Sequence, residues 1–155
     1  MKEESQRIPP EKKNIRAMFN NIAKRYDFLN HFLSLGIDNY WRRKVIKILK
    51  DHQPKEILDV ATGTGDLAIK LIKLKPTKII GIDIAEEMLT IANEKIIKKK
   101  LNKTIEVFTA DSENLPFNNM TFDAVTVAFG VRNFENLEKG INEMGRVLKS
   151  EGKAV

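Results

Sequence analysis

From Pro54 onward the sequence alternates short apolar runs with longer segments of helical periodicity, and this alternation constrains the fold more than any other feature. The apolar runs span residues 56–61, 78–83, 104–109 and 122–128. Apolar residues recur at helical spacing over 66–73, 86–100 and 137–148. Strands that alternate with helices pair in parallel, so we predict an open, doubly wound α/β sheet. A fifth strand is expected to begin where the chain stops, so we expect C-terminal strands to be missing from this chain.

A helical segment is expected ahead of the sheet. Residues 1–13 are interpreted as a flexible arm, because Pro9 and Pro10 oppose an early helix. From Asn14 onward, apolar side chains follow helical spacing. This periodicity predicts a long amphipathic helix over the remainder of the N-terminal region up to Gly36.

A second helix is predicted to begin at Asp38, which is a suitable N-cap residue. It carries an apolar face of Trp41, Val45, Ile48 and Leu49, and we assign Trp41 to packing. The two helices are expected to cover one face of the sheet. The predicted domain therefore covers residues 14–155, with a helical cover at 14–53 and a cofactor-binding α/β part at 55–155.

Composition excludes several classes of function. The chain has no cysteine, which excludes a disulfide scaffold, a thiolate zinc site and a cysteine nucleophile. Its two histidines, His31 and His52, match no metal-ligand spacing, so no metal is expected. A polar N-terminus and the lack of a long apolar run favour a soluble, cytoplasmic protein. The net charge is +6, but its densest cluster, residues 95–103, lacks interleaved aromatics, so we expect a solvated helix end and no nucleic-acid partner.

The first apolar run leads into a turn that contains Gly63, Thr64 and Gly65. Glycines let the backbone approach a ligand closely, and the helix that follows presents free amides. Asp83 ends the second run, where a carboxylate can accept hydrogen bonds from ribose hydroxyls. These features indicate a nucleotide-type ligand. They also suit NAD, because Gly63, Gly65 and Ala68 satisfy the dinucleotide fingerprint.

Two acidic residues favour a different ligand. Asp59 lies at the carboxyl end of the first predicted strand, where its charge would oppose a pyrophosphate but would suit an ammonium or sulfonium group. Asp111, followed by Ser112, ends the third run, where a carboxylate can accept the exocyclic amine of adenine. S-adenosylmethionine combines a sulfonium group with a neutral adenosine, so we predict it as the ligand.

These residues together resemble the class I S-adenosylmethionine-dependent methyltransferases, whose fold is a Rossmann-like doubly wound parallel sheet. Three separated motifs narrow the resemblance to the ubiquinone/menaquinone biosynthesis C-methyltransferases. They are Tyr-Asp-Phe-Leu-Asn at 26–30 with Ser-Leu-Gly at 34–36 and Trp41, Phe-Gly-Val-Arg-Asn at 129–133, and Arg-Val-Leu-Lys at 146–149.

The resemblance implies where each part of the cofactor would bind. Gly63, Thr64 and Gly65 would lie against its methionine part, Asp83 would hold the ribose, and the adenine would contact Asp111 and Ser112. Ala128 would lie at the end of the fourth strand, where this strand runs past the reacting methyl group.

The acceptor implied by the resemblance is a polyprenylated quinol, with demethylmenaquinol favoured over a ubiquinone precursor. Arg132 would stabilise an oxyanion on the quinol ring and Asn133 would orient it, while Tyr26 would pass a proton or cover the ring. The alternatives are a methyltransferase for RNA or another small molecule, and a cofactor-binding fragment without activity. Contact with the inner face of a membrane stays open at this stage.

Overall fold

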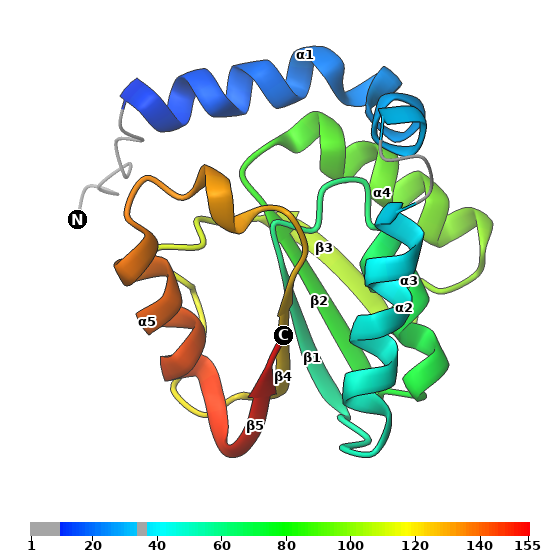
Figure 1. Cartoon of the computed structure of the whole chain (residues 1–155), viewed down its shortest axis with the longest axis vertical. Coiled ribbons are helices and arrows are strands. Elements are labelled where there is room, and N and C mark those ends of the chain that lie inside the picture. The colour runs from blue at the N-terminus through cyan, green and yellow to red at the C-terminus, as the bar shows by residue number, and fades with distance from the viewer. Residues whose placement is uncertain (1–9, 34–36) are drawn as a thin grey trace.

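The computed structural model describes residues 10–33 and 37–155. In chain order the elements are α1 (Pro10–Leu33), α2 (Ile37–Lys50), β1 (Glu56–Val60), α3 (Asp66–Leu71), the 3-10 turn η1 (Ile72–Leu74), β2 (Lys78–Asp83), α4 (Glu86–Lys98), β3 (Ile105–Thr109), β4 (Phe122–Val127), the 3-10 turn η2 (Val131–Asn133), α5 (Leu137–Val147) and β5 (Leu148–Ala154). Figure 1 shows the strands side by side with helices around them.

The strands form one parallel sheet in the order β3-β2-β1-β4-β5. This arrangement confirms the predicted doubly wound α/β fold, and β1 to β4 lie within a residue of their predicted ends. The strand order reverses between β1 and β4, which is the topological switch point where sheets of this kind hold ligands. The site is therefore expected at the carboxyl ends of β1 and β4.

Alternating side chains of the strands bury two separate cores. One face of the sheet packs against α2, α3 and α4, and its buried residues are Leu49, Ile57, Leu67, Ala68, Leu71, Leu74, Ile79, Ile96, Ile105 and Ala124. The other face packs against α5, and its buried residues are Leu58, Val60, Ile82, Leu115, Phe122, Val125, Met144 and Val147. The period of two along β1, seen in Ile57 and Leu58, sends successive side chains to opposite cores.

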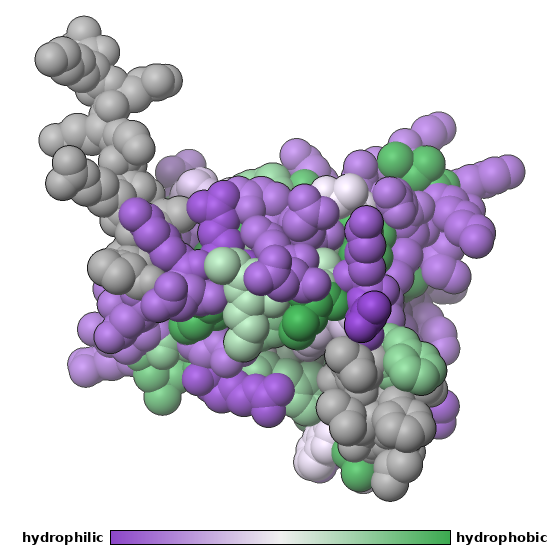
Figure 2. All heavy atoms as spheres, turned by 90° about the horizontal axis from the view of Figure 1, so that it is seen from above, coloured by the Kyte–Doolittle hydropathy of each residue, from purple (hydrophilic) through white to green (hydrophobic). Residues whose placement is uncertain are grey.

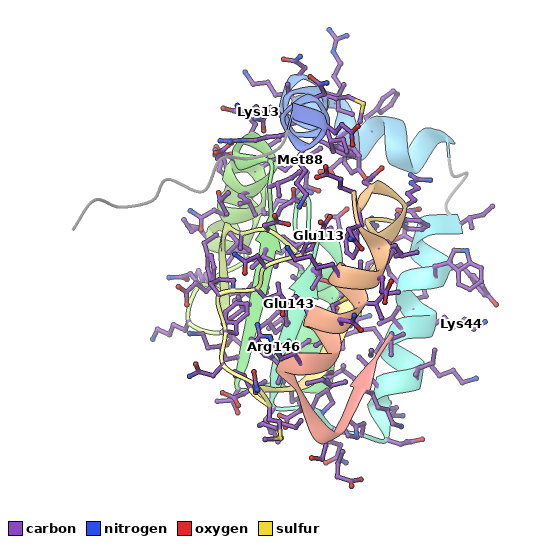
Figure 3. All side chains as sticks on the ribbon, turned by 90° about the vertical axis from the view of Figure 1, so that its left-hand side faces the viewer. Lys13, Lys44, Met88, Glu113, Glu143 and Arg146 are labelled. Carbon is purple, nitrogen blue, oxygen red and sulfur yellow. The ribbon has the colours of Figure 1, made fainter. Side chains whose placement is uncertain are left out.

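Charged residues of α5 fasten the segment that follows β3 (Figure 3). Arg146 donates to the carbonyl oxygens of Leu115 at 3.0 Å and Phe117 at 2.7 Å, and it pairs with Glu143. Glu143 in turn accepts a hydrogen bond from the Leu115 N–H at 2.8 Å. The hydrogen bonds from the Arg146 guanidinium lower the pKa of Glu143. Burial of the carboxylate opposes this effect but is weaker. This end of the candidate site thus has a rigid support.

The fifth strand differs from the prediction. β5 follows α5 directly and pairs with β4 through a register shift between Phe122 and Ala124, so it lies within the chain. Its pairing continues at Val155, whose N–H donates to the Val125 carbonyl at 2.9 Å. The sequence placed the start of this strand too late, because residues 149–153 have no apolar run and the strand is mostly exposed. Hydrogen-bond pairing with β4, and not the local composition, holds β5 in the strand conformation.

The position of α1 also differs from the prediction. It begins at Pro10 instead of Asn14, because a proline at the first position of a helix gives up an N–H that has no partner there. It lies across the carboxyl ends of the strands, where Figure 1 shows it above the sheet, and does not cover a sheet face. Its outward surface is mostly hydrophilic, with small hydrophobic patches (Figure 2). Residues 1–9 of the predicted arm and the Ser-Leu-Gly motif at 34–36 lie outside the described residues.

In α2 the predicted apolar face is divided between the core and the surface. Leu49 is buried against the sheet, whereas Trp41 and Ile48 are exposed, so Trp41 packs against Tyr40 and Lys44 at the surface and not in the core. Asp38 lies in the first turn of the helix, not at its N-cap, and it is buried in an ion pair with Arg42 at 2.7 Å. The helical spacing of apolar residues allowed either side of α2 to pack against the core, and the contacts with α3 determine which side does so.

Candidate active site

A cavity of about 370 Å³ lies between α1 and the carboxyl ends of the strands. Seven predicted site residues line it, namely Tyr26, Gly63, Asp83, Ser112, Ala128, Arg132 and Asn133. Its roof is the apolar underside of α1, with Ile15, Met18, Phe19 and Ile22. Met88 of α4 forms part of the floor beneath α1 (Figure 3). Across the described ranges no group of three His, Asp or Glu side chains is placed to hold a metal ion, and no helix is long and apolar enough to cross a bilayer.

The glycine turn after β1 depends on backbone conformations that glycine adopts at little cost. Gly63 and Gly65 have φ values of 57° and 78°. A Cβ on Gly65 would also lie 3.1 Å from the Ala92 Cβ of α4, which is tighter than ordinary contact. Gly65 therefore shapes the turn without lining the cavity, whereas Gly63 faces the cavity with its backbone.

Asp83 connects the glycine turn to the start of α4. Its carboxylate accepts the Gly63 N–H at 2.9 Å and the Ala85 N–H at 3.0 Å. Burial raises the pKa of Asp83, and these backbone hydrogen bonds oppose that rise. A carboxylate has about four acceptor positions, so lone pairs remain for hydroxyl groups in the cavity.

Asp59 is buried at the switch point and lines a smaller pocket that adjoins the main cavity, together with Thr64. Its oxygens accept hydrogen bonds from the hydroxyls of Thr62 and Thr126, both at 2.7 Å. Burial raises the pKa of Asp59 to about 6, and the two threonine hydroxyls limit this rise. At neutral pH the group is mainly a carboxylate that lacks a cationic hydrogen-bond partner among the described residues, which suits a positively charged ligand group.

Asp111 lies just outside the cavity, while its neighbour Ser112 lines it. The Asp111 carboxylate pairs with Lys12 of α1 at 2.7 Å and accepts the Glu113 N–H at 2.9 Å. Lys12 also pairs with Glu113 at 3.0 Å. Burial alone would lower the pKa of Lys12, but its hydrogen bonds to Asp111 and Glu113 raise it, so the ammonium stays charged. The predicted adenine end of the site is therefore closed by an ion-pair cluster in which Lys12 and Glu113 are buried and Asp111 is partly exposed.

Glu113 joins three segments around the cavity (Figure 3). One carboxylate oxygen pairs with Lys12 of α1, and the other accepts the N–H groups of Glu135 and Asn136 at 2.9 and 3.2 Å. These amides follow η2, the turn that carries Arg132 and Asn133. Glu113 thus links the roof helix to the turn on the opposite wall.

Further polar contacts hold α1 over the cavity along its length. Arg16 forms a two-pronged pair with Glu86, one arm of which measures 2.9 Å, and the Asn20 side chain accepts the Glu87 N–H at 3.1 Å. These contacts place α1 against the first turn of α4. The roof is therefore fixed by side chains and not by backbone pairing.

Near the other end of α1, Asp27 accepts a hydrogen bond from the Thr64 hydroxyl and pairs with Lys95. Lys95 also pairs with Asp66 at 2.9 Å. The expectation of a solvated cluster is therefore wrong for Lys95, because these carboxylates from α1 and α3 surround its ammonium. The remaining lysines at 98–100 are exposed, as expected.

The wall formed by the end of β4 is closely packed against the end of β1. Phe129 and Ala61 both have positive φ values, of 65° and 53°. A Cβ on Gly130 would lie 2.3 Å from the Ala61 Cβ, so no larger residue fits there without a shift. This packing directs η2 toward the cavity, where Arg132 and Asn133 reach it.

Arg132 of η2 and Tyr26 of α1 both line the cavity. Burial raises the pKa of Tyr26, although the charges of Arg132 and Arg42 oppose that rise. The phenol therefore stays protonated at neutral pH, and Tyr26 is suited to donate a hydrogen bond, not to act as a base. No described carboxylate forms an ion pair with Arg132, so its guanidinium is available to a ligand oxygen.

Apart from Tyr26, sequence reasoning missed the contribution of α1 to the site. The apolar spacing of Ile15, Phe19 and Ile22 was visible, but it does not say whether a helix covers a sheet or a cavity. Lys12 was assigned to the flexible arm, and Glu113 gave no signal because its partners are remote in sequence. Only the folded arrangement brings them together.

Solved structures show the same architecture. A structure from Methanococcus maripaludis aligns with a TM-score of 0.77 at 26% identity, over 87% of this chain and 61% of the other. A SAM-dependent methyltransferase from Aquifex aeolicus aligns with a TM-score of 0.62 at 33% identity, over 70% of this chain and 58% of its own. The sheet order, the glycine turn and the acidic strand ends define a class I S-adenosylmethionine-dependent methyltransferase fold.

Residues 6–155 match the ubiE/COQ5 methyltransferase family, and the chain belongs to this family. A relative named demethylmenaquinone methyltransferase, from Bacteroides fragilis, is 52% identical over 142 residues, which cover 91% of this chain and 58% of the relative. One named ubiquinone/menaquinone biosynthesis C-methyltransferase UbiE, from Geobacter sulfurreducens, is 42% identical over 96% of this chain and 59% of its own length. The chain thus spans somewhat under two thirds of the curated relatives it matches.

Proposed function

We propose that this chain forms the cofactor-binding part of a C-methyltransferase that transfers a methyl group from S-adenosylmethionine to a ring carbon of a polyprenylated quinol, with demethylmenaquinol as the acceptor. The observation that carries the proposal is that one cavity beneath α1 has Asp83 and Gly63 at one wall and Arg132 and Asn133 at another. The names of the relatives support the acceptor class.

The residues of the cavity fit the chemistry of the cofactor. Asp83 keeps free lone pairs for the ribose hydroxyls, and the open space beside Gly63 can take the methionine part. The Asp59 carboxylate adjoins that turn and offers negative charge to an ammonium or sulfonium group. Ser112 and Asp111 lie where the adenine is expected, beneath Lys12. Bound S-adenosylmethionine would supply an electrophilic methyl group on a positively charged sulfur.

The residues at the opposite wall fit an aromatic acceptor that carries a hydroxyl group. A quinol carbon becomes nucleophilic as its neighbouring hydroxyl loses a proton, so an adjacent oxyanion needs a fixed positive partner. Arg132 provides that partner, with no competing carboxylate in the described part of the chain, and Asn133 lies beside it on η2. Tyr26, protonated at neutral pH, can donate a hydrogen bond to the same ring or cover it. The apolar side chains of α1 exclude water, which favours alignment of the acceptor carbon.

The location of the reaction follows from the acceptor. A polyprenyl chain keeps a quinol in a bilayer, so we place the enzyme in the cytoplasm, working at the inner membrane surface. A ubiquinone-branch quinol has the same ring chemistry and is the alternative acceptor within the same proposal.

Two measurements test the proposal. Calorimetry of the chain with S-adenosylmethionine is expected to show one binding site, and the absence of binding would overturn the cofactor assignment. The product of the complete gene is then assayed with labelled S-adenosylmethionine and three acceptors: demethylmenaquinol, a ubiquinone-branch quinol and RNA. Label in a quinol supports the proposal, while transfer to RNA alone refutes the acceptor class.

A further inference from the structure

The outward face of α2 carries an apolar stripe that the core does not use. Ile37, Tyr40, Trp41 and Ile48 are exposed by 55, 60, 46 and 44%, although the helical spacing aligns them along one side. The opposite side of the helix packs through Leu49 against the sheet. A helix that buries one apolar stripe and exposes a second one has an additional apolar surface that can bind another partner.

The exposed stripe is surrounded by positive charge. Arg43, Lys44, Lys47 and Lys50 of α2 are all exposed. The acidic residue within the helix, Asp38, is buried against Arg42, and Asp51 is exposed just beyond its end. The outer face therefore combines apolar rings with a strongly positive rim, which complements a surface that is apolar beneath and negative at its edge.

The aromatic side chains of this face are already arranged. The Tyr40 and Trp41 rings form an edge-to-face pair with centroids 5.6 Å apart. The Lys44 ammonium lies 4.8 Å from the centre of the Trp41 ring, on the side of α2 that points away from the sheet (Figure 3). Tyrosine and tryptophan beside lysine are the side chains that occupy the boundary between lipid headgroups and acyl chains.

We propose that the outer face of α2, formed by Ile37, Tyr40, Trp41, Lys44, Lys47 and Ile48, docks on a membrane surface that contains anionic lipid. The helix would lie in the plane of the interface, with its rings among the acyl chains and its lysines on the headgroup phosphates. The exposed lysines 98–100 at the end of α4 have comparable charge but no aromatic companions, so they would not insert. Docking through α2 keeps the chain at the surface that holds a polyprenylated acceptor.

Trp41 provides a direct probe, because the chain has one tryptophan. The chain is titrated with vesicles of phosphatidylcholine alone and of phosphatidylcholine mixed with phosphatidylglycerol, without cofactor or acceptor. With the anionic vesicles we expect the Trp41 emission to shift to the blue and its quenching by acrylamide to fall. Added salt should weaken the binding, since the lysine contacts are exposed.

Matched charge removals locate the contact. Each cation near an anionic surface contributes about a fivefold change in affinity, so Lys44→Gln with Lys47→Gln should weaken vesicle binding roughly 25-fold. Lys98→Gln with Lys99→Gln removes the same charge elsewhere and should have little effect. Circular dichroism checks that both pairs are folded. Tyr40→Ser with Ile48→Ser should reduce binding at unchanged charge.

Three results would overturn the proposal. The anionic and neutral vesicles could give the same Trp41 response, or the two lysine pairs could weaken binding equally. In the product of the complete gene, Trp41 could also be shielded from acrylamide before any vesicle is added, which would show that protein covers the face. None of these measurements uses the cofactor or the acceptor, so failure here is distinguishable from failure of the proposed function.

Discussion

Removal of the Lys12 ammonium should release α1 from the cavity. In Lys12→Met the side chain keeps its length, but Glu113, only 6% exposed, loses its cationic partner. Removing one member of a buried pair costs roughly 3–5 kcal/mol, because the other charge stays buried. Asp111 is 32% exposed and can be hydrated, so its share is smaller. We expect the free energy of unfolding to fall by about 3 kcal/mol. The loss stays at the lower end of the range because α1 can detach and let water reach Glu113.

The assay is urea denaturation followed by circular dichroism, with hydrogen exchange of α1 peptides measured by mass spectrometry. Lys13→Met is the matched control, because Lys13 is the exposed neighbour of Lys12 and should change stability by no more than about 0.5 kcal/mol. Adding Glu113→Gln to Lys12→Met removes the orphaned charge and should recover part of the loss. If the Lys12 and Lys13 variants are equally stable and α1 exchanges equally in both, the cluster does not hold the roof.

Substitutions at three further positions test the site. Asp83→Ala should weaken S-adenosylmethionine binding about ten- to a hundredfold, because charge-assisted hydrogen bonds contribute roughly 1.5–3 kcal/mol each; unchanged affinity in a folded variant would contradict the ribose role. Arg132→Ala in the complete gene product should lower kcat by about 10²–10³ with little change in cofactor Kd, and Arg132→Lys should recover part of it; normal turnover would move the acceptor site elsewhere. Burial raises the pKa of Asp59 to about 6 from an ordinary 3.8, so stability that is full below pH 4 declines as the pH rises through 6. Asp59→Asn should therefore gain roughly 2–3 kcal/mol on the wild type between pH 4 and pH 7 while binding cofactor more weakly, and a stability difference independent of pH would refute this.

The strands and the glycine turn could be predicted because their signals are local. An apolar run such as 78–83 must be buried on both sides, and Gly63 and Gly65 occupy a turn that glycine favours. The residues at the strand ends followed from topology, since parallel strands bring their carboxyl ends to one edge. Asp83 and Asp111 were placed at this edge in this way; Asp83 lines the cavity, whereas Asp111 lies just outside it.

The elements that escaped prediction are those decided by distant contacts. β5 is ordered by pairing with β4, although Lys149–Lys153 has little strand character of its own. Lys12 acquires a role through residues about a hundred positions away, and no spacing rule reports such a partnership. Trp41 was placed on the same apolar face as Leu49, but only the part of that face near Leu49 contacts the sheet, and Trp41 is exposed.

The side-chain contacts that hold α1 have a consequence for the order of folding. They join residues separated by 99 positions for Lys12 and Asp111 and by 70 for Arg16 and Glu86. α1 is synthesised before the elements that receive it, so at a ribosomal rate of about 5–20 residues per second its partners follow roughly 5–20 s later. During that interval the underside with Ile15, Phe19 and Ile22 has no cavity to cover. Although α1 is synthesised before α4 and β3, it can therefore dock only after both have formed.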